Sequence, residues 1–522
     1  MQGPDFDLRQ CRTTLPLALL AARKRHGGRT AILEDPERKP LTYNQLVLGA
    51  MVLGARLKSI AKGDARIGVL LPSVNGVIVT LFGLLFHGIT PVLLNFTAGV
   101  RNLRSACVTA EVEVIVTSRR FVEQARLDDV VSALGEGREI VYLEDVRKGI
   151  GFRDKVTGVL KTLFARLVAQ RAGTDSNAPA VILFTSGTEG APKGVVLSHA
   201  NLVGNTMQIW QHAAGAISPT DVAFNPLPVF HSFGLTAGTL LGLLNGMKVV
   251  LYPSPLHYKQ VPKLIHETKA TLLLATDTFL VGYARAAEAG ELASLKLVVT
   301  GAERVKDGTR ALWAPFGTMI LEGYGCTECS PVLACNLPDD NRFGTVGRLL
   351  PGITAKLEPV EGIHDGARLV VKGPNVMRGY MLAETPSEIR PLPDEWYDTG
   401  DIVQIDSDGF VTIRGRAKRF AKLGGEMISL AAVEALANGL WPDATHVAVT
   451  LPDPRKGEQV VLVTDRPEAD RSALLAHARE QEVAELYVPR AILVVEKIPV
   501  LGSGKIDYAG TADLAQKMRA LI

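Results

Sequence analysis

Short apolar runs alternate with longer amphipathic patterns through the first part of the chain. The runs are rich in Val, Ile and Leu at consecutive positions, which indicates strands buried on both faces. They read "RIGVLLP" (66–72), "TPVLLN" (90–95), "VEVIVTS" (112–118), "REIVYLE" (138–144), "AVILFTS" (180–186), "MKVVLYP" (247–253), "ATLLLAT" (270–276) and "LKLVVTG" (295–301). Strands that alternate with helices predict an α/β fold of parallel-rich sheets covered by helices.

The pattern changes after about Gly344. Short strands of alternating polarity, joined by turns such as Asp408-Gly409, predict a small antiparallel subdomain. The last hundred or so residues return to a mixed pattern of helices and strands. We expect an N-terminal domain over 1–416, with the β subdomain at 344–416, and a small α+β C-terminal domain over 417–522. The turn-rich, cationic stretch 414–426 is the expected junction.

Composition narrows the class of protein. The 522 residues carry a formal net charge of only +3, which argues against a general nucleic-acid binder. Five cysteines, an odd number, fit a reducing compartment better than a disulfide framework. The most apolar stretch, 76–96, contains His87 and Pro91 and predicts a buried helix followed by a strand, not a membrane span. With no signal peptide visible, we expect a cytoplasmic protein.

One polar stretch follows a predicted buried strand directly. "FTSGTEGAPKG" (184–194) combines glycines with hydroxyl side chains and Lys193. Glycines let backbone N–H groups approach an anion, while the hydroxyl groups and the lysine add donors and charge suited to phosphate. The order of residues is not that of a Walker A loop. The stretch predicts a phosphate-binding loop at the carboxyl end of a strand.

This stretch and five later ones resemble, in order, the motifs of the adenylate-forming superfamily of acyl-CoA synthetases, luciferases and adenylation domains. The later ones are "PLPVFHSFG" (226–234), "EGYGCTE" (322–328), "YDTGD" (397–401), "GRAKRFAKLGGEMISLAAVE" (415–434) and "PVLGSGK" (499–505). The resemblance implies that a carboxylate attacks the α-phosphate of ATP to give an acyl-adenylate, and that a nucleophile then takes the acyl group. It also implies a C-terminal domain that rotates between the two half-reactions.

The resemblance assigns roles to individual residues. It implies ATP contacts from Thr185, Ser186, Gly187, Thr188, Glu189, Gly190, Lys193, Gly301, Ala302, Glu303, Glu322, Gly323, Tyr324, Gly325, Thr327, Asp401, Arg416 and Lys505. Among these, Asp401 and Arg416 would hold the ribose and Tyr324 would face the adenine. Lys505, Glu328 and Thr188 would be catalytic: Lys505 would stabilise growing charge, and Glu328 and Thr188 would hold Mg²⁺. His231, Phe233 and Gly234 would line the acyl pocket, and Lys418 would be the hinge.

Longer stretches resemble one subgroup, the synthetase half of the bacterial bifunctional 2-acylglycerophosphoethanolamine acyltransferase/acyl-ACP synthetase. They include "YPSPLHYKQVPKLI" (252–265) and "IPVLGSGKIDY" (498–508). The acyltransferase motif H-x-x-x-x-D is missing, because none of the ten histidines has an aspartate five positions later. The resemblance implies a stand-alone synthetase that transfers a fatty acyl group to acyl carrier protein, with coenzyme A as the alternative acceptor. The cationic junction, including Arg419 and Lys422, suits an acidic carrier protein.

The segment 154–171 has a helical pattern with its apolar residues on one face and basic residues among them. Two interpretations stay open. The helix could pack its apolar face on the core, or it could touch anionic lipid at the inner face of a membrane.

Overall fold

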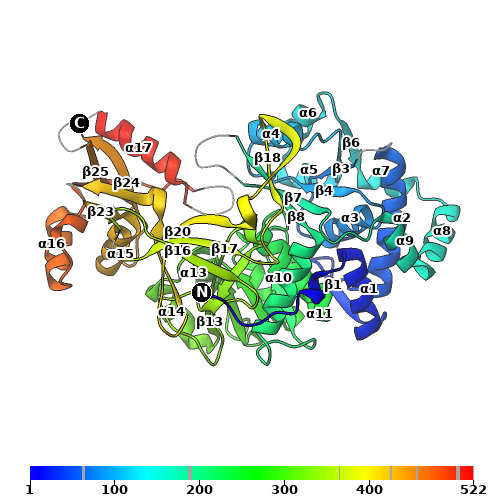
Figure 1. Cartoon of the computed structure of the whole chain (residues 1–522), viewed down its shortest axis with the longest axis horizontal. Coiled ribbons are helices and arrows are strands. Elements are labelled where there is room, and N and C mark those ends of the chain that lie inside the picture. The colour runs from blue at the N-terminus through cyan, green and yellow to red at the C-terminus, as the bar shows by residue number, and fades with distance from the viewer. Residues whose placement is uncertain are drawn as a thin grey trace.

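The computed structural model describes residues 1–61, 65–185, 191–363, 365–423, 426–453, 457–500 and 506–520. A large N-terminal part holds two extended sheets and a smaller third one, and a small C-terminal part lies at one end of the molecule (Figure 1). This is the α/β architecture expected from the sequence, and that prediction is confirmed.

The first sheet contains most of the strands predicted in the N-terminal third. Its strands are β3 (Arg66–Val69), β4 (Thr90–Leu93), β5 (Val114–Thr117), β6 (Glu139–Tyr142), β7 (Pro179–Thr185), β8 (Lys193–Ser198), β18 (Gly379–Leu382) and β19 (Thr385–Pro391). They lie in the order β19-β18-β8-β7-β4-β3-β5-β6. The strands from β7 to β6 are parallel, whereas β8, β18 and β19 pair antiparallel at the other edge. The hairpin β18–β19 therefore joins this sheet and not the small antiparallel sheet in which the sequence placed it.

The second sheet takes up the strands of the middle third. It consists of β1 (Ala31–Glu34), β2 (Leu41–Thr42), β9 (Val222–Asn225), β10 (Lys248–Leu251), β11 (Leu272–Ala275), β12 (Leu297–Thr300), β13 (Met319–Gly325), β14 (Val332–Cys335) and β15 (Arg348–Leu349). The order is β15-β14-β13-β12-β11-β9-β10-β1-β2. Within it, the six strands β13-β12-β11-β9-β10-β1 are all parallel. The carboxyl ends of β12 and β13 therefore open on the same edge, where ligands bind in such sheets.

Helices fill the space between and around the two sheets. In chain order they are α1 (Leu15–His26), α2 (Tyr43–Ala61), α3 (Asn75–Leu85), α4 (Val100–Thr109), α5 (Arg119–Ala125), α6 (Asp128–Gly135), α7 (Leu143–Lys148), α8 (Phe152–Leu163), α9 (Ala165–Ala172), α10 (His199–His212), α11 (Leu241–Asn245), α12 (Gln260–Thr268), α13 (Asp277–Ala286) and α14 (Asp307–Trp313). The stretch 76–96 forms the buried helix α3 and then β4, as predicted. Among the described residues, every helix is too short or too polar to span a bilayer.

The third sheet links the two ends of the molecule. It is antiparallel and consists of β16 (Thr354–Glu358), β17 (Ala367–Lys372), β20 (Tyr397–Ile405) and β21 (Val411–Arg416). The C-terminal part follows, with β22 (Phe420–Leu423), β23 (Glu426–Ser429), α15 (Leu430–Leu440), β24 (His446–Asp453), β25 (Gly457–Thr464), α16 (Arg471–Glu480), β26 (Ala491–Val494) and α17 (Tyr508–Ala520). The division at 416/417 stays a prediction; it falls where β21 ends and a short 3₁₀ turn (Ala417–Arg419) begins.

The helices α2 and α3 pack at very close range because both carry glycine at the crossing. A Cβ at Gly54 would lie 2.1 Å from the Gly83 carbonyl oxygen and 2.5 Å from Nδ1 of His87. Backbone atoms cannot move away at low cost, so Gly54→Ala is expected to destabilise the protein by about 1–3 kcal/mol. Urea unfolding measures the change.

A glycine in open space provides the control. No atom lies within 4 Å of a Cβ at Gly308 in α14, so Gly308→Ala is expected to be neutral or to stabilise by about 0.5–1 kcal/mol. Equal stability for the two variants would contradict the close packing of α2 on α3.

A buried histidine ties α10 to the start of α1. The Leu15 amide donates to Nδ1 of His199 at 3.2 Å, and burial lowers the pKa of His199 to about 4. The folded state therefore binds fewer protons here than the unfolded state, so stability falls as the pH drops from about 6.5 to 4. This group contributes about 3 kcal/mol to the fall.

We expect His199→Gln to be less stable at pH 7 and to lose less further stability between pH 6.5 and 4. The measurement is the free energy of unfolding across that range. Parallel pH profiles for variant and wild type would show that another group controls the acid response.

Candidate functional site

The centre of the candidate site is a buried carboxylate held by two sheets. Asp401 on β20 pairs in register with Arg416 on β21, so their side chains lie on the same face. Arg416 Nε lies 3.2 Å from Asp401 Oδ1, and the hydroxyl of Tyr324, from β13 of the second sheet, donates to Oδ2 at 2.5 Å. Three residues assigned to the nucleotide site by resemblance therefore meet at one point.

The electrostatics of this cluster follow from burial. Burial raises the pKa of Asp401, while the Arg416 charge and the Tyr324 hydrogen bond act in the opposite direction. Burial and the nearby Asp401 charge raise the pKa of Tyr324 well above its usual range, so its hydroxyl stays a donor. A carboxylate offers about four lone-pair positions, which leaves room on Asp401 for ribose hydroxyls.

A second cluster surrounds Glu328, at the 3₁₀ turn Thr327–Cys329 that follows β13. The Tyr380 hydroxyl, from β18 of the first sheet, donates to Glu328 Oε1 at 2.8 Å. The ammonium of Lys193 on β8 lies 5.3 Å from the centre of the Tyr380 ring, at cation–π distance. Tyr380 thus lies between Lys193, predicted to bind ATP, and Glu328, predicted to hold Mg²⁺. Sequence reasoning missed Tyr380, because nothing in its local pattern sets it apart.

The strand end at Gly301, predicted to contact ATP, lies beside Phe233, predicted to line the acyl pocket. A Cβ at Gly301 would lie 3.3 Å from the ring of Phe233, which begins a π-helix, Phe233–Leu240. Next to it, Ala302 has a positive φ of 69°, a strained conformation that is common at binding sites. Two residues assigned to the nucleotide and acyl sides by resemblance are therefore neighbours; their roles stay predictions.

The other predicted acyl-side residues lie in the same segment. A Cβ at Gly234 would lie 2.3 Å from the Pro228 carbonyl oxygen, so only glycine fits there. His231 packs its ring against Phe230, with centroids 4.7 Å apart. The Ser232 hydroxyl donates to the Thr327 hydroxyl at 3.3 Å, which joins this segment to the Glu328 turn.

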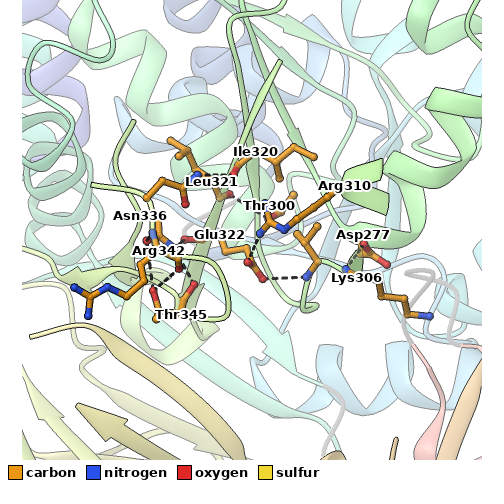
Figure 2. A network of polar contacts seen from close by, with 12 residues as sticks. Asp277, Thr300, Lys306, Arg310, Ile320, Leu321, Glu322, Asn336, Arg342 and Thr345 are labelled. Atoms are coloured by element: carbon orange, nitrogen blue, oxygen red, sulfur yellow. Dashed lines mark hydrogen bonds and ion pairs between the residues drawn. The ribbon is translucent and has the colours of Figure 1, made fainter. Parts of the chain in front are cut away.

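Two acids predicted to bind ATP, Glu303 and Glu322, direct their carboxylates to neighbouring residues of the protein. The Glu322 carboxylate pairs with Arg310 (Figure 2). It also accepts the Val305 amide at 3.0 Å. The Glu303 carboxylate accepts the amide and the hydroxyl of Thr278 at 3.0 and 2.9 Å, at the start of α13. These bonds hold the loop after β12 at Glu303 and at Val305. A nucleotide contact by Glu322 would come from its backbone.

The structure describes some of the remaining predicted site residues and leaves others out. Gly323 and Gly325 lie on β13, where a Cβ at Gly325 would come within 1.9 Å of the Pro331 carbonyl oxygen. Thr185 ends β7 and pairs with Lys193. The predicted phosphate-loop and catalytic residues Ser186, Gly187, Thr188, Glu189, Gly190 and Lys505 lie outside the described residues.

The cationic junction is less open than its sequence suggests. Arg419 pairs with Glu434 at 2.7 Å, donates to the Ala448 carbonyl at 3.1 Å and stacks over Tyr508. Its charge is paired inside the C-terminal part. That the junction faces an acidic partner stays a prediction. Lys422 is exposed, and so is Lys418, the predicted hinge.

A family comparison agrees with this geometry. The profile of AMP-binding enzymes matches residues 19–381. The chain belongs to the AMP-binding enzyme family. Membership makes it an adenylate-forming enzyme of the AMP-forming acid–thiol ligase class.

Relatives of this AMP-binding enzyme extend over nearly its whole length. A long-chain-fatty-acid–CoA ligase of Bacillus subtilis is 28% identical and covers 90% of this chain and 89% of its own. A feruloyl-CoA synthase of Amycolatopsis is 29% identical over 93% and 94%. ATP-bound MatB from Rhodopseudomonas palustris has the same fold, with a TM-score of 0.79 at 23% identity over 97% and 99%. These names point to coenzyme A ligases and do not single out an acyl-ACP synthetase.

Of the two predicted magnesium ligands, the structure describes Glu328, and Thr188 lies outside the described residues. Glu328 is a buried carboxylate, a hard oxygen ligand of the kind Mg²⁺ prefers, and Tyr380 fixes one of its oxygens. Glu328 would hold the ion together with Thr188. When bound, the ion would neutralise phosphate charge.

Asp401 supplies the first test of the site. Asp401→Asn keeps the shape but removes the charge that pairs with Arg416 and that would accept the ribose hydroxyls. Hydrogen bonds to charged groups are each worth about 1.5–3 kcal/mol, so AMP affinity is expected to fall roughly tenfold or more. Isothermal titration with AMP measures it.

The matched control is Asp398→Asn, an exposed carboxylate in the same motif that lies 3.4 Å from Arg368. It should leave AMP affinity within about twofold of wild type. Unchanged affinity in Asp401→Asn would remove this carboxylate from the nucleotide site.

Proposed function

We propose that this AMP-binding enzyme activates a fatty acid with ATP and transfers the acyl group to coenzyme A. The observation that carries the proposal is the cluster of Asp401, Arg416 and Tyr324, with Glu328 nearby, beside the apolar segment of Phe233. The names of relatives support the substrate class and the acceptor, because long-chain-fatty-acid–CoA ligases occur among them at 27–28% identity.

The chemistry requires two steps. A carboxylate oxygen of the fatty acid attacks the α-phosphorus of ATP, and pyrophosphate leaves. A thiolate then attacks the acyl carbonyl carbon, and AMP leaves. Arg416 and Asp401 would hold the ribose, Lys193 and residues 185–190 the phosphates, and the segment His231–Gly234 the acyl chain. Lys505 would stabilise the charge that grows at the α-phosphate.

Acyl carrier protein remains a second candidate acceptor. The long stretches that resemble the acyl-ACP synthetase subgroup favour it, and so does the exposed cation Lys422 near the proposed domain junction. An acidic carrier protein would be attracted to such charges at low salt. The relatives' names favour coenzyme A, and we therefore place it first.

The direct test is the identity of the product. Purified protein, ATP, Mg²⁺ and palmitate are supplied with coenzyme A or with phosphopantetheinylated acyl carrier protein, and mass spectrometry measures each thioester. The proposal requires palmitoyl-CoA to form faster. No fatty-acid-dependent AMP release with either acceptor would refute the function as a whole.

The two half-reactions are expected to separate in variants of Lys505 and Lys418. Lys505→Ala should slow acyl-adenylate formation by a factor of about a hundred or more, because loss of one electrostatic donor costs about 2.7–4 kcal/mol. It should leave transfer from preformed acyl-adenylate nearly unchanged.

Lys418→Pro should instead keep acyl-adenylate formation and lose thioester formation, because proline fixes φ at the proposed hinge. Quenched-flow assays measure the rate of each step in each variant. Equal losses of rate in both steps would contradict these roles.

The acceptor surface is tested by reversing one exposed charge. If carrier protein is used, Lys422→Glu should raise its KM severalfold at low salt and leave coenzyme A kinetics within about twofold. Lys517→Glu, an exposed lysine on α17, is the control. If coenzyme A is the physiological acceptor, carrier protein should be a poor substrate for wild type and variant alike.

A further inference from the structure

The helices α8 and α9 expose an unusual set of large apolar side chains. We define the α8–α9 face by Phe152, Val156, Val159, Leu160, Leu163, Phe164 and Leu167. Phe152 is 82% exposed, Leu163 73% and Phe164 59%, and the other four lie between 41% and 52%. Single exposed apolar residues are normal, but seven on two consecutive helices indicate an interaction site.

These helices are attached to the body through their small residues. Gly158 lies so close to α2 that a Cβ would come within 2.2 Å of Val52 Cγ2, and in α9 the buried residues are Ala165 and Ala169. An amphipathic helix on a core normally turns its large apolar residues inward. Here they point outward, so packing on the core, one of the two interpretations of 154–171, does not account for them.

The charges around the face are mostly positive. Arg153, Lys155, Arg166 and Arg171 are exposed on the same two helices. The one acid within α8 and α9, Asp154, is held by the Gly151 amide at 2.8 Å and lies 3.8 Å from Arg56. Apolar side chains among cations match the acyl chains and headgroups of an anionic bilayer.

A second copy of the chain fits this face less well. Face-to-face contact between two copies would bring the same cations together, which costs free energy. A lipid surface instead supplies the opposite charge. The face also lies far from the C-terminal part: Figure 1 shows α8 at the opposite end of the molecule from α16. A protein docked through α8 and α9 would leave the C-terminal part in the aqueous phase.

We propose that the α8–α9 face docks the protein on an anionic lipid bilayer, with Phe152, Leu163 and Phe164 inserted among the acyl chains. The role of this docking rests on the proposed function: fatty acids partition into bilayers, so docking would place the enzyme where its substrate is concentrated. Docking itself rests on the face alone, and it needs neither ATP nor fatty acid.

The experiment measures cosedimentation of the full chain with vesicles, without ATP or fatty acid. The vesicles contain phosphatidylcholine alone or with a third phosphatidylglycerol. The apolar variant is Leu160→Gln/Leu163→Gln/Phe164→Gln, and the charge variant is Lys155→Glu/Arg166→Glu. Controls are Val108→Gln, a 52% exposed valine on α4, and Lys517→Glu on α17. Circular dichroism and AMP titration show that each variant is folded.

Wild type and both controls should bind the anionic vesicles, and less so at high salt. The apolar variant should lose roughly tenfold or more in partitioning. The charge variant should lose roughly fivefold or more per residue on anionic vesicles only.

Three outcomes would overturn the proposal. Wild type could fail to bind anionic vesicles, or the variants could bind as wild type does. Sedimentation could also show a wild-type dimer that the apolar variant dissociates, without vesicle binding, which would make the face a contact between copies. Octanoate is soluble and needs no bilayer, so AMP release with octanoate should be the same in both variants as in wild type. If the wild type releases no AMP with any fatty acid, that result counts against the proposed function and not against docking.

Discussion

A carboxylate taken out of water must find partners, and Asp401 finds them on two different sheets. Arg416 faces it across the β20–β21 pair, and Tyr324 reaches it from β13. Without Arg416, the buried charge of Asp401 would be left uncompensated. The small third sheet is therefore attached to the second sheet at the point where the predicted nucleotide-site residues meet.

The Glu328 cluster repeats this arrangement with the first sheet. Tyr380 stands on β18, which pairs with β8, and its hydroxyl crosses to Glu328 beyond the end of β13. Because β8 also carries Lys193, the Tyr380 side chain lies between the Lys193 ammonium and Glu328, the proposed magnesium ligand. The site thus lies where three sheets converge, which is consistent with functional residues drawn from widely separated motifs.

The sequence predicted the parts of this structure that depend on local pattern. The runs that became β3, β4, β5, β7, β10 and β11 are apolar at consecutive positions because both faces of those strands are buried. The edge strand β6 is partly exposed. Asp401, Arg416 and Glu328 were found through their motifs. Tyr380 was not, because its role depends on β18 returning to pair with β8, a contact between distant segments. The use of the Glu322 carboxylate by Arg310, and the engagement of Arg419 by Glu434, are likewise tertiary facts.

The central claim is that these clusters form a site for making an acyl-adenylate. The measurement that tests it most directly is exchange of labelled pyrophosphate into ATP, without any thiol acceptor. The account predicts exchange that depends on fatty acid and on Mg²⁺ and that falls strongly in Asp401→Asn. Exchange that is absent, or that proceeds equally without fatty acid, would contradict it.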